Sequence, residues 1–351
     1  MTETAVAPAA QRPEARIAAW VLAAGAAALV ALILIVGENP LSIAWAMLRG
    51  GFLTANGLAD TVVRAIPLCL IGLGVALAFR AGVFNIGADG QLLIGASLAV
   101  ACVPLLAGWP APLALAVLMG AGMIGGALWG GVAGVLKARF RANEIIATIM
   151  LNYIAVQVLG WLVRGPLQEP MGIFPQSERL PPELRLPALI DGTRISFGLL
   201  IALAAVALVW IVVARFRYGY ELTLTGQNPE AARYGGVRLG WITVSVMAFG
   251  GALAGLAGIV DVSGLHGRLQ EGFAPGFGIT GIAVALMARL NPLLVPLSAF
   301  GFAGLYVGSA TVARTTGVPF PLVHVIEAAI ILAFLASSVL RSGRPAAGEG
   351  A

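Results

Sequence analysis

The chain consists largely of apolar stretches, most of them near the length that crosses a lipid bilayer as a helix. Such a crossing takes roughly 20 residues, and the period-two alternation typical of a membrane β-barrel is missing. Hydrophobic residues make up 59% of the chain and charged residues only 11%, against roughly 25% charged residues in a soluble domain. Lipid is therefore the expected solvent, and we predict an all-α bundle of transmembrane helices.

We expect about ten spans, because each must be near the roughly 20 residues that cross a bilayer. They cover residues 17–36, 60–79, 85–107, 113–136, 144–163, 197–214, 242–262, 277–289, 292–311 and 321–340. The eighth is short and follows the glycine-rich residues 272–276. It is therefore either a full crossing or a half-helix that enters and leaves on one side, which would leave nine spans.

Basic residues orient the bundle, since short cytoplasmic loops carry an excess of Lys and Arg. Clusters at residues 137–141 and 215–217, together with Arg12 and Arg16, place both termini in the cytoplasm. The transmembrane domain then extends from 17 to 340, with a disordered cytoplasmic tail at 1–16 and a second tail at 341–351. The first apolar stretch is too long for a signal-peptide core. A proline-rich loop at 164–196 is predicted outside, and a loop at 215–240 is predicted inside.

Several functions are excluded by missing residues. The only lysine, Lys137, is followed by Ala138, so the Gly-Lys-Ser/Thr of a nucleotide-binding P-loop is absent. His266 and His324 lie far apart outside any HExxH pattern, which argues against a catalytic metal. The net charge of +5 comes without a basic cluster interleaved with aromatic residues, so nucleic acid is not an expected partner. We expect no cofactor in this chain.

Polar residues at membrane depth are the first candidates for function. Glu144, Thr148 and Asn152 follow one another at a spacing of four and so share one helix face. Such a stripe is costly against lipid. Two interpretations remain open: an interhelical hydrogen-bond seam, or the lining of a solute pathway.

A second polar group interrupts the chain between the second and third predicted spans. Asn85, Asp89 and Gln91 stand among three glycines, Gly82, Gly87 and Gly90. This composition favours a tight turn or a broken helix, whose freed backbone groups bond either a ligand or another helix.

Two further patterns concern helix packing and an alternative function. Gly122, Gly126, Gly130 and Gly134 recur every four residues, which predicts a glycine face against a neighbouring helix. His324 and Glu327 are three residues apart in the last span and suggest an alternative function, a proton-coupled secondary transporter with an intramembrane relay.

The loop at 215–240 contains the signals of a short helix. Asn228 is a favourable N-cap, Pro229 suits the first helical position, and Glu230 complements the positive end of the helix. Gly235 or Gly236 supplies a left-handed stop. We predict a capped helix of about two turns that lies outside the membrane and docks to a soluble partner.

Three segments carry a family resemblance: FRAGVFNIGADGQL at 79–92, NEIIATIMLNY at 143–153 and GQNPEAARYGG at 226–236. They resemble bacterial ABC importer permeases of the ribose, galactose and branched-chain amino acid family, and most of all its nucleoside and simple-sugar branch. GIAVAL at 281–286 and the Asn291–Pro292 pair also fit. Asp89 departs from the glutamate expected at its position.

The resemblance implies a type II importer fold in the bacterial inner membrane. Two permeases, here different chains, would surround a pathway that works by alternating access. A cytoplasmic ABC ATPase beneath each would hold ATP and Mg, and an extracytoplasmic binding protein would deliver a small polar solute, a nucleoside or a simple sugar. The implied pathway residues are Asn85, Asp89, Gln91, Glu144, Thr148 and Asn152. The implied coupling residues are Gly226, Asn228, Pro229, Glu230, Ala231, Ala232, Arg233, Tyr234 and Gly235.

Overall fold

The computed structural model describes residues 39–273 and 276–315, together with Val30, Leu34 and Gly37. Over these residues the chain is helical, and its only β pairings are three isolated bridges. The predicted all-α class is confirmed. The predicted spans 17–36 (apart from Val30 and Leu34) and 321–340, both tails and the His324–Glu327 pair lie outside the described residues.

Six helices among the described residues are long and apolar enough to cross a membrane. They are α3 (Ala55–Arg80), α5 (Ala111–Phe140), α6 (Glu144–Val163), α7 (Gly198–Arg215), α10 (Leu239–Asp261) with a π-helical extension to His266, and α12 (Val295–Thr315). The shorter helices are α2 (Pro40–Leu48), α4 (Ala88–Ala101), α8 (Arg217–Gln227), α9 (Pro229–Tyr234) and α11 (Phe277–Met287). The chain is thus a multi-pass membrane protein.

The chain divides into two compact units, residues 51–307 and residues 1–50 with 308–351. In the second unit, α2 begins at the cap Asn39, whose Oδ1 accepts a hydrogen bond from the Leu41 amide at 2.9 Å. A Cβ added at Gly50 would lie 2.6 Å from Cβ of Thr311, so the chain after α2 passes close to the last turns of α12. All of the candidate site residues belong to the first unit, residues 51–307.

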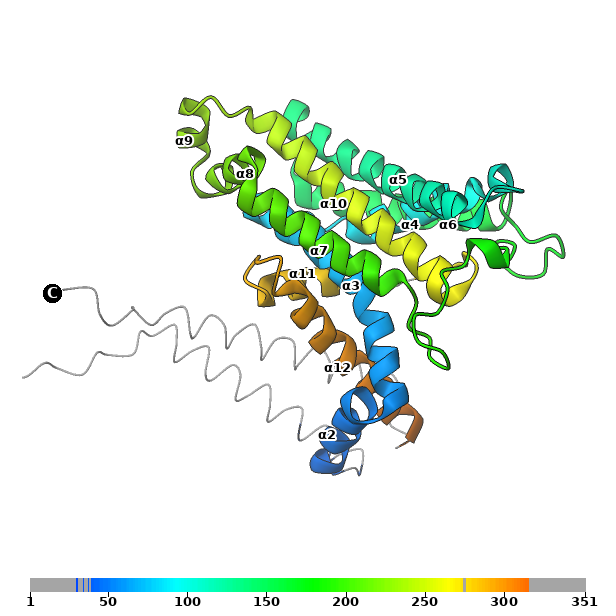
Figure 1. Ribbon diagram of the computed structural model, residues 1–351. Helices are drawn as coiled ribbons and strands as arrows, with labels where there is room; N and C mark the ends of the chain where they lie inside the picture. Colours follow the sequence, from blue (N-terminus) through cyan, green and yellow to red (C-terminus); the bar gives the residue numbers. More distant parts are fainter. Residues whose placement is uncertain (1–29, 31–33, 35–36, 38, 274–275, 316–351) are drawn as a thin grey trace, which may run out of the picture. The chain divides into compact units, whose positions relative to one another are not determined.

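Helix α10 is the centre of the larger unit, where it packs against α5, α3 and α4 (Figure 1). The predicted glycine face of α5 makes this packing close. A Cβ added at Gly122 would lie 2.7 Å from Cγ2 of Ile259, and one at Gly134 would lie 2.8 Å from Cα of Val244. Both contacts are with α10, so the prediction of a glycine-mediated helix contact is confirmed.

The predicted span 85–107 is shorter than expected. Helix α3 ends at Arg80, Gly82 takes a positive φ of 71°, and α4 begins only at Ala88. At the other end α4 stops at Ala101 and a 3₁₀ turn, Val103–Leu106, follows, because Pro104 has no N–H to donate in a continued α-helix. The result is a helix of 14 residues, below the roughly 20 that cross a bilayer.

Helix α11 resolves the alternatives for the eighth span. It has 11 residues and starts after Gly276, whose φ of 78° turns the chain into the helix. Eleven residues rise only about 16 Å at 1.5 Å per residue, about half of the hydrocarbon thickness. Of the two alternatives, the half-helix agrees with the structure.

The loop at 215–240 holds two helices rather than one. Helix α8, which the sequence analysis missed, is anchored by the fully buried Leu222 and carries an ion pair from Arg217 Nε to Glu221 at 2.6 Å. Tyr218 shares a hydrogen bond of 3.0 Å with Ser245 on α10. Burial raises the pKa of Tyr218 above its usual value, so the hydroxyl stays protonated.

Helix α9 begins as predicted. Asn228 Oδ1 accepts hydrogen bonds from the amides of Glu230 at 3.1 Å and Ala231 at 3.0 Å, which confirms the cap. The left-handed stop is Gly236, with a φ of 82°, and not Gly235, whose φ is −73°. Helices α8 and α9 lie together beside the ends of α7 and α10 (Figure 1).

Residues 164–196 form an irregular loop that is tied by hydrogen bonds to the segment after α10. Backbone amides of Ser177, Leu180 and Leu186 donate to carbonyl groups of residues 263–269 at 2.7 to 3.0 Å. Arg164 also pairs with Glu271 at 2.6 Å. The loop therefore has a defined shape and packs against the end of the bundle.

Candidate functional site

Two amide side chains lie at the centre of the break between α3 and α4. Asn85 and Gln91 are each 1% exposed and exchange two hydrogen bonds, both 3.1 Å long, between Nδ2 and Oε1 and between Nε2 and Oδ1. Asn85 Oδ1 also accepts from the Gly87 amide at 3.0 Å. Because buried amides are costly without partners, this exchange fixes the path of the non-helical residues 83–87.

Asn152 reaches the same segment from α6. Its Oδ1 accepts from the Gly90 amide at 2.8 Å, and its Nδ2 donates to the Ile86 carbonyl at 2.9 Å. The Gly90 amide is one of the first N–H groups of α4, which have no partner within the helix. Asn152 therefore supplies the cap that α4 lacks in its own sequence. It also joins α6 to the broken segment.

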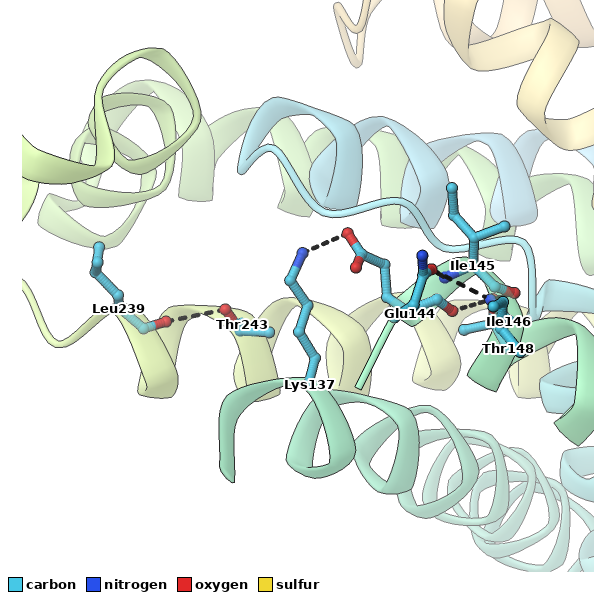
Figure 2. Close-up of polar contacts among 8 residues, drawn as sticks. Lys137, Glu144, Ile145, Ile146, Thr148, Leu239 and Thr243 are labelled. Atoms are coloured by element: carbon cyan, nitrogen blue, oxygen red, sulfur yellow. Dashed lines mark hydrogen bonds and ion pairs between the residues drawn. The ribbon is translucent and has the colours of Figure 1, made fainter. Parts of the chain in front are cut away.

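The other two residues of the stripe have partners closer by. Thr148 is fully buried, and its hydroxyl donates to the Glu144 carbonyl of its own helix at 2.7 Å. Glu144 forms an ion pair with Lys137, and Figure 2 shows these side chains pointing toward each other across the turn from α5 to α6. In that turn Arg141 adopts a left-handed conformation with a φ of 55°. The stripe thus joins α6 to α5 at one end and to α4 at the other.

Asp89 contacts α11, a pairing that the sequence did not indicate. Its Oδ1 accepts a hydrogen bond of 2.6 Å from the amide of Gly278, in the first turn of α11. The fit is close, because a Cβ added at Gly278 would lie 2.9 Å from the Asp89 Cγ. A carboxylate is favourable at this positive helix end. No local pattern relates these two residues, so only the fold reveals the contact.

The predicted pathway residues therefore gather at one place, with one exception. Asn85, Asp89, Gln91, Thr148 and Asn152 all surround the break between α3 and α4, where a Cβ added at Gly87 would lie 3.1 Å from Cβ of Thr148. Glu144 lies one turn of α6 further along, at the ion pair.

The predicted coupling residues lie on a surface-exposed corner. Tyr234 is 94% exposed, Glu230 and Arg233 are exposed, and Ala232 is fully buried and attaches α9 to the molecule. Gly226, in the last turn of α8, packs directly on the backbone at the end of α3, because an added Cβ would lie 3.0 Å from the Gly82 nitrogen. The coupling residues and the broken segment are therefore neighbours in space.

A second polar cluster was missed by the sequence analysis. The Arg64 guanidinium carbon lies 3.4 Å from the ring centre of Tyr306 and 4.7 Å from that of Phe277. At the end of α10, Nδ1 of His266 in the π-helical extension lies 3.4 Å from Oδ2 of Asp261, the last residue of α10. The signal available in the sequence was the presence of Arg64 and Asp261 inside apolar spans.

Comparison with known proteins gives consistent matches along almost the whole chain. The family described as "Branched-chain amino acid transport system / permease component" matches residues 57–339. A glucose ABC transporter permease protein of Haloferax volcanii is 38% identical over 92% of this chain and 86% of its own length. A guanosine ABC transporter permease protein of Bacillus subtilis is 35% identical over 90% of both chains. A nucleoside ABC transporter permease protein of Lactococcus lactis is 29% identical over 79% of both.

Proposed function

This chain belongs to the family of permease components of branched-chain amino acid transport systems and is the membrane-spanning permease subunit of an ABC transporter. Because the relatives in this family that it resembles are named for glucose, guanosine and nucleosides, we propose that it imports a nucleoside or a simple sugar. The observation that carries the proposal is the extent of the match. Relatives named for glucose and for guanosine each align with nine-tenths or more of this chain. A nucleoside and a simple sugar share a polar ring rich in hydroxyl groups.

The energy source in this proposal is a partner ATPase. The chain has no P-loop, and α9 provides an exposed helix in the loop predicted to face the cytoplasm. Tyr234, Arg233 and Glu230 give this helix an aromatic side chain and both charge signs. Such a short, exposed helix suits binding in a groove on an ATPase subunit.

The further partners follow from the same proposal. A second, non-identical permease chain pairs with this one, an extracytoplasmic binding protein delivers the solute, and the complex lies in the bacterial inner membrane. The predicted pathway residues border the solute pathway without lining it directly. They are Asn85, Asp89, Gln91, Glu144, Thr148 and Asn152. Their hydrogen bonds within the chain support a positioning role rather than direct solute contact.

Nothing in the relatives favours the proton-coupled alternative, since they are named as ABC transporter subunits. His324 and Glu327, the pair on which that alternative rests, lie outside the described residues.

The test is transport by the complex isolated with this chain from its native membrane and reconstituted in liposomes. We expect saturable, ATP-dependent uptake of labelled guanosine, ribose or glucose, with competition identifying the preferred class. ATP-dependent uptake of none of the three would overturn the solute assignment. Uptake powered by a proton gradient without ATP would overturn the importer assignment.

A further inference from the structure

The end of α8 and the end of α3 meet through two glycines with no side chain between them. A Cβ added at Gly226 would lie 3.0 Å from both the Arg80 carbonyl carbon and the Gly82 nitrogen. A Cβ added at Gly82 would lie 3.3 Å from the Gly226 Cα, and the φ of 71° at Gly82 itself favours glycine. Because the atoms in contact are backbone atoms, neither side can yield by changing a rotamer.

On one side of this contact is α9. Only Asn228 separates the last residue of α8 from the first residue of α9. Its amide donates to the Leu224 carbonyl of α8 at 2.9 Å while its side chain caps α9. The two helices therefore join without a flexible linker, and Gly226 lies two residues from the cap. A displacement of α9 must move Gly226.

On the other side is the buried amide cluster. The Val83 amide donates to the Ala78 carbonyl at 2.9 Å, which fixes the turn around Gly82 to the last turn of α3. Three residues beyond Gly82 is Asn85, bonded to Gln91. The hydrogen bonds of Asn152 and Asp89 extend the connection from this segment to α6 and α11.

From these contacts we propose that the Gly226–Gly82 contact is the mechanical joint that transmits movement of α9 to the broken segment between α3 and α4. The proposal rests on the proposed function, in which α9 docks on the ATPase. Gly226 and Gly82 are then positioning residues for transport. The cluster of Asn85, Gln91, Asn152 and Asp89 distributes the movement to α4, α6 and α11.

A competing route runs along the chain itself. After α9, residues 235–238 lead directly into α10, and Val237 is 8% exposed and packed in place. If the covalent link to α10 carried the movement alone, the Gly226 contact would be dispensable. The two routes therefore predict different results for a substitution at Gly226.

The test uses Gly226→Ala in the reconstituted complex, with Gly240→Ala as the matched control. The added methyl at Gly226 meets backbone, whereas at Gly240 its nearest neighbour is Cβ of Ala138 at 3.7 Å. We expect the amount of solute transported per ATP hydrolysed to fall about tenfold in Gly226→Ala, within the range of coupling between protein sites. Gly240→Ala should keep the wild-type ratio. An unchanged ratio of solute transported to ATP hydrolysed in Gly226→Ala would contradict the proposed role of the Gly226–Gly82 contact.

A second measurement covers the outcome in which Gly226→Ala fails to assemble. Phe84, 50% exposed, follows Gly82 by two residues. We expect the thiol of Phe84→Cys, with Cys69 and Cys102 replaced by Ala, to change its labelling rate severalfold between the nucleotide-free and ATP-bound complex. An equal labelling rate in both states would contradict the transmission of movement through the Gly226–Gly82 contact. Absence of solute-stimulated ATP hydrolysis in the wild-type complex would instead overturn the proposed function.

Discussion

Two neighbouring glycines at the end of α9 differ in backbone conformation although they are chemically identical. Gly236 has a φ of 82°, which a side chain penalises, whereas Gly235 has a φ of −73° and only ordinary contacts for an added Cβ, the nearest at 3.4 Å. The identity of the stop residue is thus decided by the hydrogen bonds of the turn, in which the Gly235 amide donates to Ala231 and the Gly236 amide to Arg233.

This difference gives a matched pair of variants. We expect Gly236→Ala to destabilise the end of α9 by about 1–2 kcal/mol and to weaken ATPase docking, seen as reduced co-purification of the ATPase and reduced uptake. Gly235→Ala should behave like the wild type in both measurements. Equal loss in the two variants would contradict the assignment of Gly236 as the stop.

Asn152 is a second position where one side chain determines the local structure. In Asn152→Leu the Gly90 amide and the Ile86 carbonyl lose their partners, at a cost of about 1–3 kcal/mol for an unsatisfied buried group. We expect a lower melting temperature in detergent and reduced transport by the assembled complex. Asn152→Asp keeps an acceptor for the Gly90 amide and should lose less stability. Full transport by Asn152→Leu would contradict a role for this contact.

At the scale of elements, α10 determines the bundle because α5, α3 and α4 all pack along it. Its contact with α5 is made of glycines on both helices, so the backbones approach without side chains between them. Close approach of this kind gains van der Waals contact in lipid, where no hydrophobic effect drives helices together. The short helix α4 packs beside this pair, whereas α11 packs on α3 and α4, and both short helices begin at a polar contact inside the bundle.

Two glycines of α5 allow this packing to be tested. A Cβ added at Gly126 would lie 2.9 Å from backbone atoms of Gly255, whereas one at Gly131 has its nearest neighbour at 3.9 Å. We expect Gly126→Ala to destabilise the protein by about 1–3 kcal/mol, as overpacking does, and Gly131→Ala to have little effect. Thermal unfolding of the two variants in detergent measures the difference. Similar melting temperatures would contradict the close α5–α10 contact.

For the whole molecule, a further prediction concerns ATP hydrolysis, which we assign to the partner ATPase and not to this chain. Because the chain has no P-loop, we expect the purified chain alone to hydrolyse no ATP and to drive no solute uptake into liposomes, with or without a proton gradient. Adding its ATPase partner should restore hydrolysis that depends on docking to α9. Gradient-driven uptake by the chain alone would contradict this prediction.

What the sequence determined by itself is the local structure. Apolar runs specify transmembrane helices because lipid offers no hydrogen bonds to the backbone, and the α9 cap follows from Asn228 because a cap bonds amides only two or three residues ahead. The α5 glycine face follows from its period in the same way. The presence of Asn85, Asp89, Gln91 and Asn152 marked the candidate site.

Only the tertiary structure decided which of these residues meet. Asp89 and the Gly278 amide are 189 residues apart, and Asn152 and the Gly90 amide are 62 apart. No local pattern encodes such pairs, because they depend on how α4, α6 and α11 pack. Helix α8 was missed because its apolar face is short: the helix has 11 residues, two of them glycines, and Leu222 is its main buried side chain, so tertiary contacts rather than local propensity hold it. The Gly226–Gly82 contact could not be predicted for the same reason, since a glycine in the sequence does not indicate which backbone it will touch.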